Sequence, residues 1–157
     1  MKKSIRKMND KGFSLVELII VIAIMAILIG VLAPQFAKYV EQSRRSTDIQ
    51  NAENIKNAIL ADIADGEITG SGTAVAVNGQ TGGLTVTTIT QYPVVAGSGT
   101  GVNGTHFTAT YDAVNGTCEV SAGSAVLTNP TVAADYKDGT IDGSAAGGSG
   151  GAGGGAS

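Results

Sequence analysis

Glu17 is the one charged residue in an apolar run that extends from Phe13 to Ala33, a length of 21 residues. A helix of that length spans about 31 Å, which is close to the hydrocarbon thickness of a lipid bilayer. A lone carboxylate in lipid costs about 2.5–3.5 kcal/mol on the lenient insertion scale, and less near a helix end. The chemistry that Glu17 offers is therefore ion pairing, and its surroundings call for a cation as partner.

Few other side chains could act on a substrate. His106 is the only histidine and Cys118 the only cysteine, which excludes an internal disulfide framework and a cysteine metal cluster. Cys118 is expected either as a small core residue or in a bridge to another molecule. Residues 99–104 match G-x-G-x-x-G by letter, but a strand pattern follows them where a dinucleotide site needs a helix. We therefore expect no enzyme activity and no cofactor.

Three carboxylates near a glycine turn raise one metal hypothesis. Asp135, Asp138 and Asp142 surround Gly139 and could offer oxygen ligands to calcium. Their spacing does not match an EF-hand loop, and an ordinary solvated acidic loop explains them as well. The calcium site stays a hypothesis at this point.

Basic residues gather at the start of the chain. Five of the ten basic residues lie in the first eleven positions, namely Lys2, Lys3, Arg6, Lys7 and Lys11. Such a cluster before an apolar run predicts a cytoplasmic N-terminus, with everything after Gln35 outside the cytoplasm. From residue 13 onward five basic residues face twelve acidic ones, a net charge of 5 − 12 = −7, so direct nucleic-acid binding is not expected.

Two ordinary explanations of the apolar run leave a feature unexplained. A secretory signal peptide has a shorter apolar region of about 7–15 residues and a small-x-small cleavage site. Here Pro34 stands directly behind Ala33, which is a poor arrangement for the protease. A plain membrane anchor explains the length of the run but gives Glu17 no partner.

Residues 11–17, KGFSLVE, resemble the N-terminal signature of type IV prepilins and the related pseudopilins. The resemblance implies that prepilin peptidase cuts between Gly12 and Phe13 and methylates the new amine of Phe13. It also implies that Glu17 pairs with the terminal amine of a neighbouring subunit during assembly. Pro34 falls where the family usually has a proline. The resemblance covers residues 7–64 and says little about the rest of the chain.

The chemistry of the segment agrees with this resemblance. Gly12 has no side chain, so an extended backbone can enter a tight protease site. An amine and a carboxylate in a low dielectric attract each other far more strongly than in water. The pair could therefore set the axial register between subunits while their apolar helices pack.

The helix is predicted to continue beyond the membrane, from residue 13 to residue 64, with Gly66 as its stop. Its second half, residues 34–65, is amphipathic, and its apolar residues step by three or four along one stripe: Ile49, Ala52, Ile55, Ile59 and Ile63. Pro34 removes a donor and crowds the carbonyl of Gly30, so a kink is expected there. It is either a simple proline kink or, as the resemblance implies, part of an S-shaped helix that can lengthen in a filament.

Four charged residues follow Pro34 on the predicted helix. Glu41 lies at helical contact spacing from both Arg44 and Arg45, and Arg44 from Asp48. Two interpretations remain open, a solvated helix face or salt bridges between subunits.

The C-terminal half is predicted as a β-rich head over residues 66–142. Short β-like runs alternate with turn signals at 73–77, 84–90, 105–111 and 117–121, with a weaker run at 125–128. The pair 105–111 and 117–121 is expected to form a hairpin. A small antiparallel sheet of about four strands would pack on the helical stripe, which is an α+β fold. Residues 143–157 are uncharged and rich in Gly, Ala and Ser, so we expect a flexible tail. Many type IV pilins close this region with a disulfide, for which Cys118 has no partner here.

Together these patterns predict a structural subunit with a leader at 1–12, a transmembrane and filament-core helix at 13–33, the amphipathic continuation, the head and the tail. The expected state is a precursor that crosses the inner membrane once and later joins a surface filament of type IV pilus kind. The implied partners are copies of itself, prepilin peptidase, an inner-membrane platform protein and an assembly ATPase. The alternatives are a pseudopilin of a type II secretion or DNA-uptake machine, and a monomeric membrane-anchored binding module.

Overall fold

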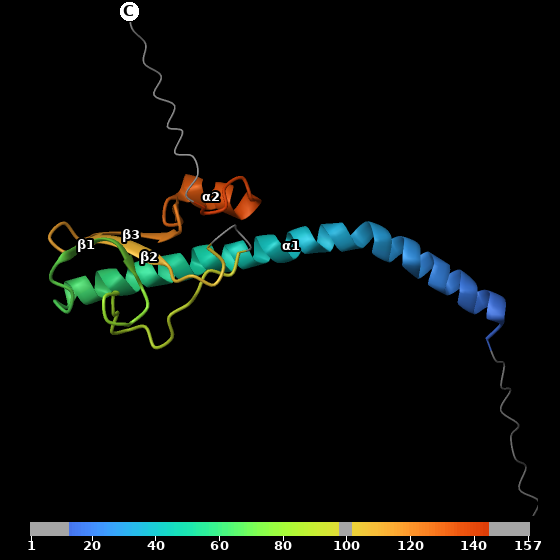
Figure 1. The fold of residues 1–157 in the computed structure, drawn as a ribbon, viewed down its shortest axis with the longest axis horizontal. Helices are drawn as coiled ribbons and strands as arrows, with labels where there is room; N and C mark the ends of the chain where they lie inside the picture. The colour runs from blue at the N-terminus through green and yellow to red at the C-terminus, as the bar shows by residue number, and fades with distance from the viewer. Residues whose placement is uncertain (1–12, 98–101, 145–157) are drawn as a thin grey trace, which may run out of the picture. The chain divides into compact units, whose positions relative to one another are not determined.

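The computed structural model describes residues 13–97 and 102–144. Over these residues the elements follow in the order α1 (Leu15–Ala64), β1 (Ser71–Ala76), β2 (Thr108–Asp112), β3 (Thr117–Ala122), β4 (Ala125–Val126) and α2 (Pro130–Asp138) (Figure 1). The chain divides into two units, residues 1–38 and 39–157, so that α1 contributes its apolar half to the first unit and its other half to the second.

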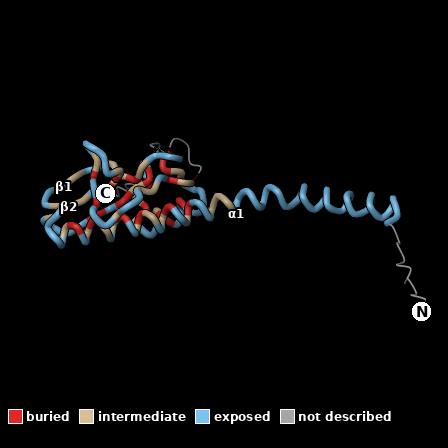
Figure 2. Tube along the Cα trace, turned by 90° about the horizontal axis from the view of Figure 1, so that it is seen from below, coloured by how far each residue is buried: buried red, intermediate tan, exposed pale blue. Residues whose placement is uncertain are grey.

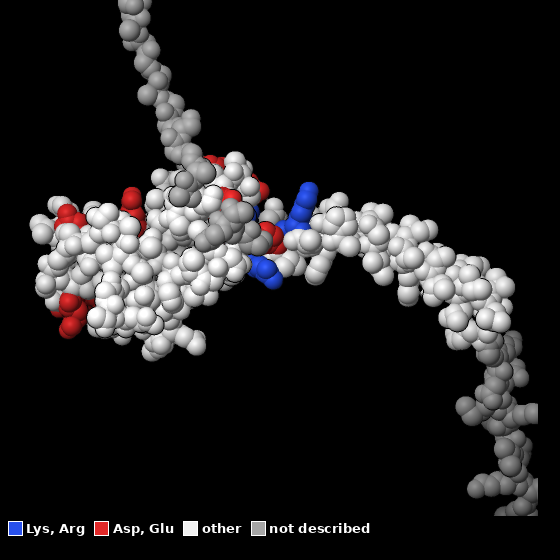
Figure 3. Space-filling view, in the orientation of Figure 1, with Lys and Arg blue, Asp and Glu red and all other residues white. Residues whose placement is uncertain are grey.

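In the first unit the apolar half of α1 is exposed along its described length. Its large side chains from Phe13 to Phe36 all lie open to the surroundings, and the surface in Figure 3 is uncharged along most of this stretch. The helix is long and apolar enough to cross a membrane, by length and composition. Helix α1 runs through Pro34 without interruption, so the kink expected at Gly30 and Pro34 stays a prediction.

In the second unit α1 presents one buried row to the head. The buried residues step by three and four along the helix, and Figure 2 shows the buried positions alternating along this part of the trace: Arg45, Asp48, Ala52, Ile55, Ile59 and Asp62. Three members of the predicted stripe, Ala52, Ile55 and Ile59, are buried as expected. Ile49 and Ile63 are only partly buried. The buried positions at the two ends of the row are occupied instead by charged residues with internal partners, Arg45 and Asp48 at one end and Asp62 at the other.

The head contains a four-stranded antiparallel sheet in the order β1-β2-β3-β4. Its buried side chains, among them Phe107, Ala109 and Val120, join Ile55 and Ile59 of α1 in one apolar core. The predicted hairpin is confirmed as β2 and β3, paired from Thr108↔Ser121 to Asp112↔Thr117. The predicted α+β fold is therefore confirmed.

The strand predicted at 84–90 is wrong. Leu84 makes only an isolated bridge to Val77, and no strand follows it in the described part of the connection. Side chains form hydrogen bonds with the backbone N–H and carbonyl groups that would otherwise pair with a neighbouring strand. The Tyr92 hydroxyl accepts from the Val86 N–H at 2.9 Å and donates to the Val86 carbonyl at 3.1 Å, while Asp62 accepts from the Thr87 N–H at 2.6 Å.

Helix α2 was not predicted, although its signals are local. The Asn129 side chain accepts from the Thr131 N–H at 3.1 Å, and Pro130 occupies the first turn. Gly139, at φ 82°, ends the helix in a left-handed conformation and donates to the carbonyls of Asp135 and Tyr136. An Asn-Pro pair followed by a glycine ten residues after the Asn could have revealed this helix in the sequence.

Replacing Asn129 with Ala should cost about 1 kcal/mol of head stability, because the Thr131 N–H loses its cap. Denaturant unfolding of the full chain in detergent, followed by tyrosine fluorescence, measures this loss. Asn129→Ser keeps a capping oxygen and serves as the matched control. Equal midpoints for the Ala and Ser variants would contradict the assigned cap.

Candidate functional site

Glu17 has a partner within its own chain. The Ser14 N–H donates to Glu17 Oε2 at 2.9 Å, and Ser14 Oγ accepts from the Val16 N–H at 3.4 Å. This arrangement is a variant of the capping box. Ser14 is the N-cap of α1 and Glu17 the third helical residue, but the Ser14 hydroxyl accepts from the second helical residue rather than the third. The S-x-x-E spacing that announces it is present in the sequence, but the sequence reasoning missed it. A carboxylate in the first turn also interacts favourably with the helix dipole.

The predicted cleavage site lies at the edge of the described structure. Phe13 is 91% exposed and immediately precedes the cap residue Ser14, whereas Gly12 lies outside the described residues. Because Glu17 folds back toward the start of α1, its carboxylate lies at the residue next to Phe13. Glu17 therefore contacts the residue that follows Phe13, at the beginning of the apolar helix.

The four charged residues predicted near the membrane boundary separate into two kinds. Arg45 is only 7% exposed, and its Nε donates to Glu41 Oε1 at 2.8 Å, which confirms one of the predicted helical pairs. Its Nη1 donates to the carbonyls of Tyr136 and Ile141, both at 2.8 Å. Arg44 is exposed. A solvated face therefore describes Arg44 but not Arg45.

Asp48 is fully buried and accepts three hydrogen bonds from distant parts of the head. Its Oδ1 accepts from the Ala96 N–H at 2.8 Å, and its Oδ2 accepts from the Gly97 N–H at 2.7 Å and from the Tyr136 hydroxyl at 3.0 Å. These are internal partners, so the structure gives Asp48 this role rather than the predicted contact with Arg44. We call Arg45, Asp48 and Tyr136 the arginine–tyrosine cluster.

Tyr136 is the centre of this cluster. The Arg45 guanidinium lies 5.0 Å from the centroid of the Tyr136 ring, within cation–π distance. Burial, together with the charge and hydrogen bond of Asp48, raises the pKa of the Tyr136 hydroxyl far above its usual range. The cluster therefore fastens the last turn of α2 to α1 and keeps the phenol neutral.

The remaining candidates for chemistry do not form a site. Cys118 is buried, and burial raises the pKa of its thiol to about 11, so it is a poor nucleophile at neutral pH. Over residues 13–97 and 102–144 no three histidine, cysteine or acidic side chains gather to hold a metal ion. Asp135 and Asp138 lie on α2, and Asp142 Oδ1 accepts from the Ser144 N–H at 2.9 Å. The structure does not bring the three predicted calcium ligands together.

The tail prediction falls mostly beyond what the structure describes. Gly143 and Ser144 are described, and residues 145–157 lie outside the described residues, as do the leader residues 1–12.

Comparison with known proteins supports the N-terminal part of these predictions. Residues 7–33 match the prokaryotic N-terminal methylation motif. Over 84 residues the chain is 33% identical to prepilin peptidase-dependent protein A of Clostridium perfringens. The aligned region covers 53% of this chain and 60% of that protein. Over 64 residues it is 36% identical to the type IV major fimbrial protein FimA of Dichelobacter nodosus. The aligned region covers 41% of this chain and 40% of that protein.

The chain therefore spans about 60% or less of the length of these curated relatives. No solved structure matches the chain. The resemblance to type IV prepilins that residues 11–17 indicate is confirmed, and the N-terminal region is type IV pilin-like.

The free energy of unfolding should fall as the pH rises above about 9. The pKa of Cys118 is raised from 9.0 to about 11 and that of Tyr136 is raised well above its usual 10.0, so the folded state favours both neutral forms. This contribution is fully present below pH 9 and is lost as the unfolded chain ionises. Tyr136→Phe should cost about 1.5–3 kcal/mol at pH 7, because it removes a hydrogen bond to a charged group.

Denaturant unfolding between pH 7 and 11 measures both effects. Tyr136→Phe keeps the ring over Arg45 but should flatten the decline above pH 10, and Cys118→Ala should flatten it between pH 9 and about 11. An unchanged pH profile in both variants would disprove the assignment of the alkaline transition to these groups.

Proposed function

We propose that this chain is a structural subunit that polymerises into a type IV pilus-like filament once residues 1–12 have been removed. The observation that carries the proposal is a glutamate in the first turn of an exposed apolar helix, four residues after Phe13 and inside the segment that matches the N-terminal methylation motif. The relative named as a fimbrial protein adds support for a filament. Catalysis has no part in this function.

The exposed half of α1 is the surface that assembly would bury. Ile24, Ile27 and Leu32 each keep more than half of their surface exposed, and their neighbours from Phe13 to Phe36 are similar. A contiguous apolar surface of this kind needs lipid or another protein around it. Lipid would cover it in the precursor, and the same helices of other copies would cover it in a filament. Burial contributes about 25 cal/mol for each Å² removed from water.

Glu17 would direct this packing through its charge. Cleavage after Gly12 would remove the basic leader and create an α-amine on Phe13, the residue next to the one that already donates to Glu17. In a low dielectric a carboxylate without a cation is costly, whereas an amine from a neighbouring copy would satisfy it. Only certain axial offsets between two helices bring the two groups together, so the pair would select the register.

The precursor in this proposal crosses the cytoplasmic membrane once, with its N-terminus in the cytoplasm, and the filament extends from the cell surface. Prepilin peptidase, a platform protein in the inner membrane and an assembly ATPase would act on it. Arg44, the exposed member of the charged group, would be available for contacts between heads. The head would form the outer surface of the filament.

A pseudopilin of a secretion or DNA-uptake machine is the nearest alternative, because it shares the N-terminal features. Long surface fibres that contain this chain would decide for the pilus, and loss of secretion without such fibres would decide for the pseudopilin. A monomeric membrane-anchored binding module is the alternative of another class, and it requires an intact N-terminus.

Coexpression with a prepilin peptidase should yield a chain that begins at N-methylated Phe13. Intact mass spectrometry of the detergent-extracted protein measures this directly. A Gly12→Leu variant, which places a bulky side chain before the cut, is the control and should keep its leader. A wild-type chain that retains Met1 in the presence of the active peptidase would favour the membrane anchor.

Glu17→Gln should reduce filament yield by more than about tenfold, the factor that corresponds to 1.4 kcal/mol. The capping box accepts Gln as well as Glu, so this variant keeps the bond from Ser14 and removes only the charge. Sheared filaments quantified against total cell-associated subunit provide the measurement. Ser14→Ala is the reciprocal control, since it weakens the cap and keeps the charge. A normal yield of filaments from Glu17→Gln would show that the charge of Glu17 is not needed for assembly and that the residue acts only as a helix cap.

A further inference from the structure

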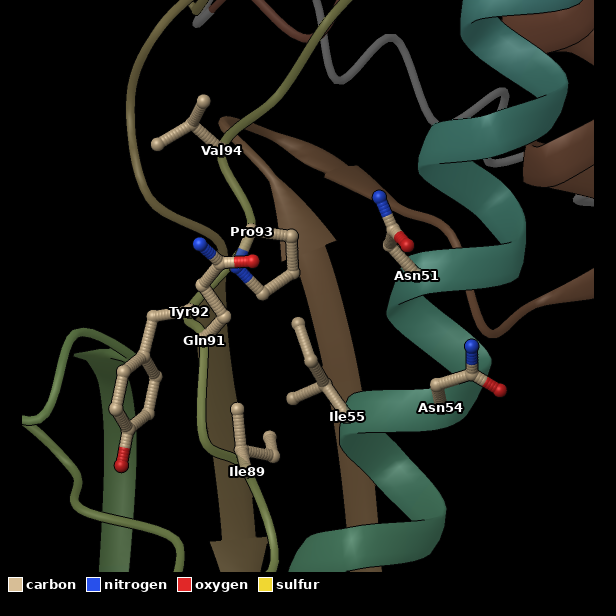
Figure 4. A pocket seen from close by; sticks show the side chains of 8 residues that line it. All are labelled: Asn51, Asn54, Ile55, Ile89, Gln91, Tyr92, Pro93 and Val94. Carbon is tan, nitrogen blue, oxygen red and sulfur yellow. The ribbon is translucent and has the colours of Figure 1, made fainter.

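A groove of about 530 Å³ lies between α1 and the connection that follows β1, within the range of about 300–1,000 Å³ typical of ligand pockets. Its lining carries three carboxamides and otherwise apolar or aromatic side chains: Asn51, Asn54, Ile55, Ile89, Gln91, Tyr92, Pro93 and Val94. Figure 4 shows Asn51 and Ile55 reaching from the helix toward the segment that carries Pro93 and Ile89. None of the lining residues is charged.

Two buried carboxylates of α1 hold this groove in shape. Asp62 accepts from the N–H and the hydroxyl of Thr87, at 2.6 and 2.8 Å, and so fastens the connection before the groove. Asp48 accepts from the N–H groups of Ala96 and Gly97 and fastens it after the groove. The segment between these two anchors therefore forms one wall at a fixed place beside α1.

The lining selects an uncharged ligand that can both donate and accept hydrogen bonds. Each carboxamide of Asn51, Asn54 and Gln91 offers N–H donors and a carbonyl acceptor, the same groups that a peptide bond offers. A phosphate or a carboxylate would find no cation among the lining residues. An extended peptide with small side chains can bring its main chain close to these carboxamides.

Residues 145–157 of the same chain have this chemistry. They comprise seven glycines, four alanines and two serines, without a charge or a bulky side chain. Fully extended, these 13 residues span about 43 Å at roughly 3.3 Å per residue. Their length and composition suit a groove that offers hydrogen bonds to main-chain groups.

The segment begins beside α2 (Figure 1), and a series of contacts within the head links its starting point to the groove wall. Ser124 holds its starting point, since the Ser124 N–H donates to the Gly143 carbonyl at 2.8 Å and its hydroxyl to the Ser144 carbonyl at 2.6 Å. Gly143 lies against Val102, because a Cβ on this glycine would be 3.3 Å from the Val102 side chain. Two residues further on, the Gly104 N–H donates to the carbonyl of Val95, the neighbour of Val94 in the groove wall.

We propose that this groove binds residues 145–157 of the same copy as an uncharged main-chain ligand. Gly and Ala lose no side-chain entropy when they dock, but ordering their backbone is costly, so the docking is reversible. A bound segment would cover the exposed edge of Val94 and the carboxamides beside it. This inference goes beyond the proposed function and does not depend on polymerisation.

Disulfide trapping in the full chain tests the proposal. In a Cys118→Ala background, the pair Asn54→Cys and Ser149→Cys is oxidised in dilute detergent solution. The control pair is Ala61→Cys with Ser149→Cys, because Ala61 is exposed on α1 seven residues further along, about 10 Å away, and does not line the groove. We expect the Asn54 pair to form an intrachain disulfide at least tenfold faster. Equal rates, or disulfides only between copies, would overturn the proposal.

A groove variant and a competing ligand complete the test. Adding Gln91→Leu removes one carboxamide from an exposed position and should slow the Asn54 pair toward the rate of the control. An unchanged rate would mean that the carboxamide does not hold the segment, and the proposal would fail.

Maltoheptaose, a neutral oligosaccharide, is then titrated against the unsubstituted chain. If it shifts the side-chain amide resonances of Asn51 and Gln91 while trapping rates are equal, the groove is a saccharide site and the proposal is overturned.

Discussion

A carboxylate taken out of water must find hydrogen-bond donors, and helix α1 meets this requirement in the same way along its length. Glu17, which is exposed, accepts a main-chain N–H at the start of the helix. The buried Asp48 accepts two, from Ala96 and Gly97 of the long connection, and the buried Asp62 accepts one from Thr87. Leaving Asp48 or Asp62 unpaired in its buried position would cost several kcal/mol. In the head, this requirement fixes where the connection between β1 and β2 crosses the helix, and the apolar residues between the anchors then pack.

The same requirement explains how the C-terminal part of the head is held. Type IV pilins often close this region with a disulfide, and Cys118, the single cysteine, is buried and free. The arginine–tyrosine cluster supplies a polar fastening in its place. Arg45 donates to the carbonyls of Tyr136 and Ile141, at the C-terminal end of α2, where a cation also interacts favourably with the helix dipole. Asp48 completes the cluster by accepting from Tyr136, so one turn of α1 holds α2 and the connection together.

The parts of this structure that the sequence predicts are those with a local or periodic signal. The apolar run and the steps of Ala52, Ile55 and Ile59 predict α1, and two alternating runs around a turn predict the β2–β3 hairpin. The roles of Arg45 and Asp48 were missed because charges at helical spacing are usually solvated, and their hydrogen-bond partners in the head lie 48 to 96 residues away. At the N-terminus, Gly12, Phe13 and Glu17 were identified from their motif, and the matched residues 7–33 include all three.

Capping by Glu17 and the charge pairing proposed for it are compatible, which bears on how the proposed precursor would keep a carboxylate in a membrane before assembly. The hydrogen bond from the Ser14 N–H goes to Oε2, and a carboxylate has about four acceptor sites on its two oxygens. The cap therefore lowers the cost of Glu17 in a single chain without using up its capacity to accept a cation. A hydrogen bond from a neutral amide does not neutralise the charge, so an incoming amine still gains the full attraction of an ion pair in a low dielectric. The same residue could thus stabilise the free precursor and still favour its association with another copy.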